Sequence, residues 1–349
     1  MTAGCIRYSA PALERGLNTH ARVVRFLTRW LVPAAIFAVL AWLIVRKIDG
    51  HEFAQALRMA DWRLVVGAGI LAGTLCMGGL ILRLYTLLAA LPHDTPVGLL
   101  ELASIHFASS AAHNLLPAPA GEVLRTVQLK RRHGYSVGVL VAAQLIEKVV
   151  EALGLGIGTL VVASLGGLPR GIDVSLYAFA ALGAGGAIVA LVVGWRWQLS
   201  DAPYASAEGL PFGAATRVHA GNFFRRLGEG MHQLRSPSVW ARSLVWSIMS
   251  DVANAVTVGL CLMAVGVTLP VAAWFLIMLV ARAAGLVPST PGQFGVQEAG
   301  VVVALGLVGV DHSRALAVAL LHHMAHFIPV TLIGLVEMKR QVVPRTVTP

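Results

Sequence analysis

This sequence contains few charged residues. Only 13% of its 349 residues are charged, whereas about 25% is usual for a soluble domain. Cysteine is also scarce, since Cys5, Cys76 and Cys261 are too few and too scattered for a disulfide framework or a zinc site. Hydrophobic residues make up 57% of the chain and its mean hydropathy is +0.74. The composition therefore excludes an ordinary soluble domain and indicates a membrane protein.

The hydrophobic residues fall into runs, and a spanning helix needs about 20 mostly apolar residues. The runs cover residues 30–45, 64–82, 99–116, 137–165, 174–194, 243–267, 271–287, 296–310 and 315–336. We predict an all-α polytopic membrane protein with about eight spanning helices, one or two re-entrant or broken segments, and two pseudo-related halves. A basic N-terminus (1–29), one membrane domain (30–340) with a long basic loop at 195–240, and a tail (341–349) complete the predicted organisation.

The net charge of +10 would suggest a nucleic-acid partner in a soluble protein. Here Lys and Arg lie between apolar runs, which is typical of cytoplasmic loops facing anionic lipids, so no nucleic-acid partner is expected. The N-terminus, loop 195–240 and tail are all predicted to be cytoplasmic, in a bacterial inner membrane. Five full spans before that loop give the wrong parity, whereas a re-entrant hairpin at 99–118 restores it. The stretch 217–235 alternates basic and apolar residues, as in an amphipathic helix on the anionic leaflet or a solvated linker helix.

Two apolar runs end in similar breaks, "LLPAPAGEVLR" at 115–125 and "LVPSTPGQFGVQE" at 286–298, about half the chain apart. Each break combines helix-breaking prolines with glycines and then a carboxylate, Glu122 or Glu298. Interrupted apolar segments at corresponding positions of two halves indicate a transporter binding site, although ordinary surface loops would also fit. The residues expected to form the two turns are Pro117, Pro119, Gly121, Pro288, Pro291, Gly292 and Gly295.

These breaks also carry a resemblance. "NLLPAPAGEVLR" at 114–125, "LIEKVVEALG" at 145–154 and "VPSTPGQFGVQEAG" at 287–300 resemble motifs of the membrane region of lysylphosphatidylglycerol synthase/flippase proteins, the multiple peptide resistance factor type. That family includes stand-alone members and relatives in hopanoid gene clusters. The chain departs from the family pattern at Lys148 (usually Arg), Glu151 (usually Asp) and Gln293 (usually Gly). The resemblance implies a lipid-handling membrane domain, and without the aminoacyl-transfer domain of the synthases we expect no enzyme.

Ionisable side chains inside a span cost roughly 2.5 to 3.5 kcal/mol each, so they tend to face a cavity or one another. Glu147 and Glu151 share one helix face, and Lys148 can pair with Glu151 at i,i+3, which would leave one carboxylate over. These residues could line a cavity, or they could form a self-neutralised buried cluster that holds helices together.

Two further pairs lie beside the breaks. Arg125 could pair with Glu122 or reach a phosphate, and Arg282 could neutralise Glu298. Asp251 and Asn254 share a helix face and are expected to make interhelical hydrogen bonds.

Three histidines cluster near the C-terminus. His322 and His326 have an i,i+4 spacing that can hold a metal, and with His323 they could relay protons or simply pack. Because there is no HExxH motif and no evident third ligand, no metal or other cofactor is predicted.

Together these features predict a lipid flippase that moves a polar or amphipathic lipid between leaflets. Arg125, Lys148 and Arg282 would neutralise a headgroup phosphate or carboxylate, and Glu122, Glu147, Glu151 and Glu298 would hold those cations or meet a cationic headgroup. The expected partners are membrane lipids (an anionic phospholipid, a hopanoid or a polyprenyl-linked lipid), with a homo-oligomer or lipid-biosynthetic partner proteins left open. The alternatives are an integral-membrane lipid-modifying enzyme and a non-catalytic subunit of a lipid-biosynthetic complex.

Overall fold

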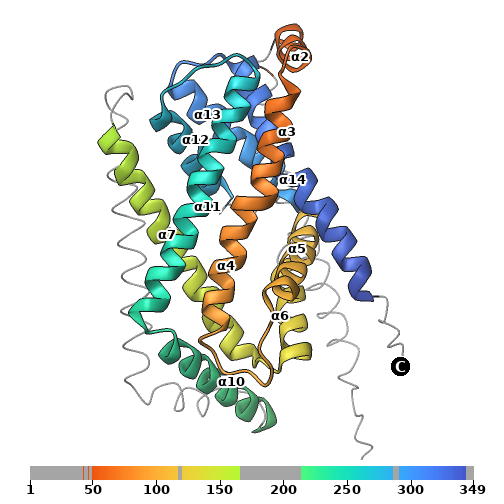
Figure 1. Ribbon diagram of the computed structural model, residues 1–349, viewed down its shortest axis with the longest axis vertical. Helices are drawn as coiled ribbons and strands as arrows, with labels where there is room; N and C mark the ends of the chain where they lie inside the picture. The colour runs from red at the N-terminus through yellow and green to blue at the C-terminus, as the bar shows by residue number, and fades with distance from the viewer. Residues whose placement is uncertain are drawn as a thin grey trace, which may run out of the picture.

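The computed structural model describes residues 42, 46, 49–116, 120–165, 214–285 and 291–342. Within these ranges every regular element is helical, as the apolar sequence predicts. Figure 1 shows an elongated helical bundle with α2 (Gly50–Arg58) at one end and α10 (Ala214–Gln233) at the other. We call these the α2 end and the α10 end.

A long helical rod follows α2. It consists of α3 (Trp62–Leu71), the π-helical segment η1 (Ala72–Cys76) and α4 (Met77–Leu88), 27 residues in all. The Asp61 side chain accepts a hydrogen bond from the backbone N–H of Arg63 at 2.9 Å, which satisfies one of the free donors at the start of the rod. The rod is one of three helices in the described residues that are long and apolar enough to cross a membrane; the others are Pro237–Ala264 and His312–Gln341.

Two shorter helices, α5 (Leu99–Leu115) and α6 (Ala120–His133), form a hairpin. Their outer ends meet near the α10 end, where Arg132 Nη1 lies 3.3 Å from Glu101 Oε1. Near the tip they touch at Gly121, because a Cβ there would lie 2.5 Å from the carbonyl oxygen of Ser109. With 17 and 14 residues, neither arm is long enough to cross a bilayer alone.

The chain then continues through α7 (Val137–Leu165), α10 and α11 (Pro237–Ala264). The segment expected to be a long polar loop therefore contains a helix. Met231 of α10 and Leu234, just after this helix, pack into a core that α7 shares. This end of the helix therefore packs against the bundle, unlike either of the two surface positions predicted for 217–235.

A second hairpin follows α11. It comprises α12 (Val271–Ala284), the 3-10 turn η2 (Pro291–Gln293) and α13 (Val296–Leu307). Figure 1 shows α12 and α13 toward the α2 end, whereas α5 and α6 lie toward the α10 end. The last helix, α14 (His312–Val342), packs against α2, α3, α5, α11 and α13.

Long-range contacts fix the directions of these elements. Asp61 N–H donates to the carbonyl of Ala264 at 2.9 Å, so the first rod starts where α11 ends and the two helices run antiparallel. Ser104 Oγ donates to Glu337 and Asn114 Nδ2 donates to Thr331, so α5 runs antiparallel to α14. The two hairpins therefore enter the bundle from opposite ends, and η2 of the second hairpin packs against α5 of the first.

The structure confirms helices at seven of the predicted apolar runs, with some different limits. The runs at 30–45 and 174–194, and most of the N-terminus and tail, lie outside the described residues. The rod extends six residues beyond the predicted end at 82, and α11 begins six residues before the predicted start at 243. Pro237 occupies the first turn of α11, where its missing N–H removes no hydrogen bond.

Candidate functional site

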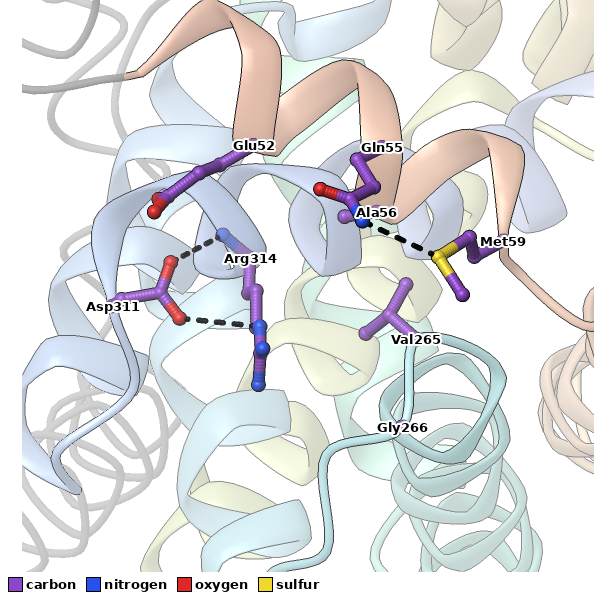
Figure 2. Close-up of a pocket in the computed structure, with 8 residues that line it drawn as sticks. All are labelled: Glu52, Gln55, Ala56, Met59, Val265, Gly266, Asp311 and Arg314. Atoms are coloured by element: carbon purple, nitrogen blue, oxygen red, sulfur yellow. Dashed lines mark hydrogen bonds and ion pairs between the residues drawn. The ribbon is translucent and has the colours of Figure 1, made fainter.

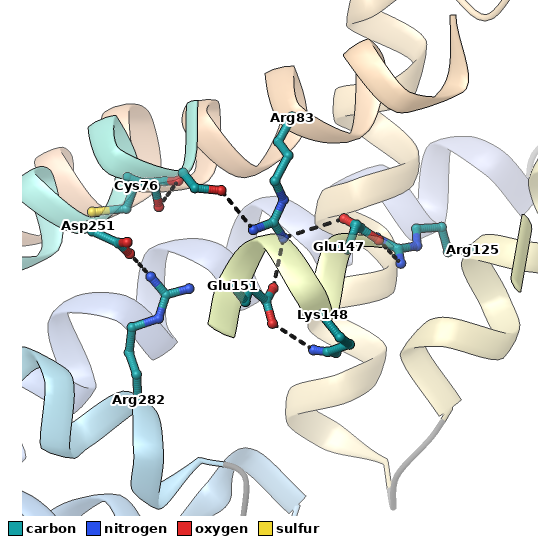
Figure 3. Close-up of polar contacts among 10 residues, drawn as sticks. Cys76, Arg83, Arg125, Glu147, Lys148, Glu151, Asp251 and Arg282 are labelled. Carbon is teal, nitrogen blue, oxygen red and sulfur yellow. Dashed lines mark hydrogen bonds and ion pairs between the residues drawn. The ribbon is translucent and has the colours of Figure 1, made fainter. Parts of the chain in front are cut away.

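Five charged side chains from three helices form one connected group, which we call the charge network (Figure 3). Arg83 of α4 lies at its centre. Its Nη2 atom is 2.7 Å from Glu151 Oε1 and 3.5 Å from Glu147 Oε1. Arg125 of α6 contacts the other oxygen of Glu147 at 2.7 Å, and Lys148 contacts the other oxygen of Glu151 at 3.0 Å. The network therefore ties α4 and the first hairpin to α7.

Burial differs across the network. Arg83 is 3% exposed and Glu147 is 4% exposed, whereas the Lys148 side chain is 65% exposed. Charges removed from water are tolerated when they are paired and hydrogen-bonded, and Arg83 gains a further partner in the Ser247 hydroxyl at 3.2 Å. Each buried charge thus has an oppositely charged partner, although Arg83 Nε makes no hydrogen bond within the described residues, and Lys148 is the cation that can be reached from outside.

The predicted pairing of Lys148 with Glu151 is confirmed, but the predicted surplus carboxylate is wrong. Arg83 and Arg125 both enter the network, so three cations face two carboxylates and the surplus charge is positive. A net positive group suits an anionic ligand, such as a lipid phosphate, better than a cationic one.

Two predicted pairs are replaced by others. Arg125 pairs with Glu147, not with Glu122, whose Oε2 is buried without a hydrogen-bond partner in the described part of the chain. Arg282 pairs with Asp251 of the adjacent helix α11, not with Glu298 (Figure 3). In both cases the arginine reaches across to another helix, a contact that sequence spacing does not reveal.

The second break explains the position of Glu298. Its Oε2 accepts a hydrogen bond from the backbone N–H of Gly295 at 2.7 Å, so the carboxylate caps the start of α13. Its Oε1 lies 2.5 Å from Nδ1 of His323 on α14. Glu298 therefore has two structural roles: it caps the start of α13 and it links α13 to α14.

The turn that precedes α13 requires unusual backbone angles. Gly292 and Gly295 have φ values of 71° and 85°, in the left-handed region that favours glycine. Gln293, which stands where the family pattern has glycine, also lies there with φ 62°. Its side-chain amide donates to the carbonyl of Gly285 at 3.3 Å, which holds the two sides of the break together. Of the other predicted turn residues, Pro291 begins η2 and Gly121 lies in α6, whereas Pro117, Pro119 and Pro288 fall outside the described residues.

The three histidines have separate partners. His322 Nε2 contacts Asn254 Oδ1 at 3.0 Å, His323 contacts Glu298, and His326 Nδ1 lies 3.2 Å from the backbone carbonyl of His322. Asn254 thus makes the predicted interhelical hydrogen bond. No group of His, Cys, Asp or Glu in the described residues is arranged to hold a metal ion.

A pocket of about 570 Å³ lies away from the network, at the α2 end. Figure 2 shows it between α2, the turn after α11 and the start of α14, with Glu52 and Asp311 among its acidic residues and Arg314 beside Asp311.

Sequence reasoning missed Arg83 as a site residue. The predicted run ends at residue 82, so Arg83 falls just outside the predicted span. The apolar sequence in fact resumes and continues to Leu91, and a lone arginine inside so long a run was the available signal.

Comparison with protein families extends the resemblance over most of the chain. The family described as lysylphosphatidylglycerol synthase TM region matches residues 30–334. A comparison with curated proteins finds no match. The family match covers both hairpins, the charge network, two of the three long apolar helices and most of the third. This chain therefore belongs to the lysylphosphatidylglycerol synthase transmembrane-region family and is a multi-pass membrane protein.

Proposed function

We propose that this protein moves a lipid with an anionic headgroup between the leaflets of the membrane. The observation that carries the proposal is the meeting of two half-length hairpins from opposite ends of the bundle, beside a buried charge network with a positive surplus. Irregular backbone survives at membrane depth only inside protein or beside water. Two such breaks, in hairpins that contact each other and beside a group of charges, favour a path for a polar group across the bilayer.

The order of elements supports two inverted halves. In each half, a shorter helix is followed by a long helix of 27 or 28 residues, a hairpin, and a second long helix of 29 or 31 residues. The first long helix of one half runs antiparallel to that of the other, and the hairpins enter from opposite ends. Inverted repeats with a binding site at their interface recur among transporters.

We infer that the α10 end is cytoplasmic, because basic side chains gather there. In the described residues they include Lys130, Arg131, Arg132, Arg225 and Arg226. At the α2 end, arginines are balanced by Asp49, Glu52, Asp61 and Asp311. Basic loops remain on the cytoplasmic side, where anionic headgroups also attract them.

Within the path, Lys148 is the group that would first meet a phosphate. Its ammonium is exposed and bound to a single carboxylate, Glu151, which Arg83 also neutralises. A phosphate can therefore take the ammonium of Lys148 without leaving a buried carboxylate unpaired. Because the acyl chains can stay in the bilayer, only the headgroup needs this polar path.

The test is leaflet exchange of a fluorescent phosphatidylglycerol in phosphatidylcholine liposomes that contain the full chain. We expect exchange faster than in protein-free liposomes, with no chemical change in the lipid by mass spectrometry. Equal rates with and without protein would refute transport, and an altered lipid would favour a lipid-modifying enzyme.

Lys148→Gln provides a sharper test, with Lys130→Gln as the matched exposed control. A charge-assisted hydrogen bond contributes about 1.5 to 3 kcal/mol, so Lys148→Gln should slow exchange of the anionic lipid roughly 10- to 150-fold. Lys130 lies at the end of α6 outside the network, and its substitution should leave the rate unchanged. Equal rates for both variants would remove Lys148 from the path.

A further inference from the structure

The pair formed by Glu298 and His323 is among the most enclosed ionisable groups in the described residues. Glu298 is 6% exposed and His323 is 3% exposed. Both carboxylate oxygens are occupied, one by the Gly295 N–H and the other by His323 Nδ1. The hydrogen bond to Nδ1 leaves Nε2 of His323 as the atom that can take up or release a proton.

Aromatic rings enclose the imidazole. The ring of Phe294 lies 4.7 Å from the His323 ring, centroid to centroid, and that of Phe327 lies 5.9 Å away, edge-on. Gly292 permits this packing, because a Cβ there would come within 2.9 Å of both phenyl rings. The imidazole therefore has a carboxylate on one side and two aromatic rings around it.

Charge counting identifies the two states of the pair. With one proton shared between Nδ1 and Oε1 the pair carries one negative charge. A second proton from water, bound at Nε2, makes His323 an imidazolium and the pair neutral. On uptake an O–H bond of a hydronium ion breaks and the Nε2–H bond forms, leaving water; on release the same two bonds change in reverse, so the cycle moves one proton and nothing else.

Other ionisable side chains lie on the elements packed around the pair. They include His322 and His326 on α14, Arg282 on α12, Asp251 on α11, and His106 and His113 on α5, which packs against η2. On the side of α14 that packs against α2, α3 and η1, those elements carry His51, Glu52, Arg58, Arg63 and Cys76. Asp251 is occupied by Arg282. Two ring nitrogens, Nδ1 of His322 and Nε2 of His326, are buried without a hydrogen-bond partner among the described residues, so each can still take part in a further hydrogen bond.

We propose that the Glu298–His323 pair is a proton-binding site that couples lipid movement to a proton gradient, an inference that rests on the transport proposed above. The pair joins the start of α13 to α14, so its charge changes the attraction that holds the tip of the second hairpin in place. His323 lies eleven residues into α14 from the α2 end, about 16 Å at 1.5 Å per residue. The α2 end, opposite the basic α10 end, is therefore the nearer side from which a proton would enter.

The test uses Glu298→Gln together with His323→Gln. This double variant keeps a hydrogen-bonding side chain at both positions and a carbonyl oxygen for the Gly295 N–H, but it cannot bind a proton. His312→Gln is the matched control, since His312 is an exposed histidine at the start of the same helix. Infrared difference spectra between acidic and alkaline pH record protonation directly, in the full chain reconstituted in phosphatidylcholine.

We expect the wild type and the control to share a band from the carboxylate-bonded imidazole of His323. The double variant should lack this band while it keeps those of its other eleven histidines. In the exchange assay with fluorescent phosphatidylglycerol, a pH gradient acid on the α2 side should raise the wild-type rate by roughly 5- to 150-fold, the usual range for coupled sites. The double variant should exchange lipid without responding to the gradient. Identical infrared spectra for wild type and double variant would overturn the proton site, whatever the transport result. Exchange that responds equally in both would overturn coupling, and absence of exchange from every sample would instead refute the proposed transport.

Discussion

Replacing Arg83 by methionine tests whether the charge network holds the bundle together. Methionine resembles the aliphatic stem of arginine but lacks the guanidinium group, so it removes the contacts to Glu147, Glu151 and Ser247. Glu147 would retain Arg125, and Glu151 would retain only the exposed Lys148. The variant therefore leaves a largely buried carboxylate with a weak partner.

The expected loss of stability is large. Removing one partner of a buried ion pair costs about 3 to 5 kcal/mol, because the other charge remains buried. Adding Glu151→Gln removes that charge as well and restores the original net charge of the network. The double variant should then recover more than half of the loss, which separates an electrostatic cause from a packing cause.

The assay is reversible unfolding in mixed micelles, followed by the loss of helical circular dichroism. Arg63→Met is the control, since Arg63 lies on the same rod but is exposed at its start. An exposed charge contributes about 0 to 1 kcal/mol, so this control should unfold close to the wild type. If Arg83→Met unfolds with the same free energy as Arg63→Met, the network does not stabilise the fold and the reasoning fails.

Two further predictions concern packing and sidedness. Gly121→Ala should lower the free energy of unfolding by about 1 to 3 kcal/mol, because the new Cβ would clash with α5. Gly67→Ala, where a Cβ would meet nothing within 4 Å, should raise the free energy of unfolding by about 0.5 to 1 kcal/mol. Equal effects of the two variants in thermal melting would contradict the close hairpin contact. In a background lacking Cys5, His51→Cys in α2 and Arg225→Cys in α10 should react with an impermeant maleimide from opposite faces of the membrane, the latter only after the cytoplasmic side is opened. Labelling of both from one side would refute the antiparallel arrangement as a membrane topology.

The limits of several helices were predictable because strong local signals mark them. The run 137–165 coincides with α7, and the predicted starts at 99, 271 and 296 coincide with those of α5, α12 and α13. Each start follows proline, glycine or a polar turn that interrupts the apolar sequence. The rod ends later than predicted, because the charged residue Arg83, which follows the predicted apolar run, lies inside the helix.

The partners of the charged residues were less predictable, for a physical reason. The contact of Lys148 with Glu151 lies within one helix turn and follows from spacing alone. The contacts of Arg125 with Glu147 and of Arg282 with Asp251 join different helices, so they depend on how each helix is rotated in the bundle. Spacing along one chain contains no information on that rotation, and both pairs were assigned to nearer carboxylates.

The short hairpin arms have a consequence for synthesis of the chain. Arms of 12 to 17 residues cannot be held across the bilayer by their own hydrophobicity. The first hairpin is flanked by α14, which is translated about 180 residues after it. The hairpin therefore stays without this neighbour until residues 312–342 have been made, and a chain stopped before residue 312 should be recognised as incomplete and degraded.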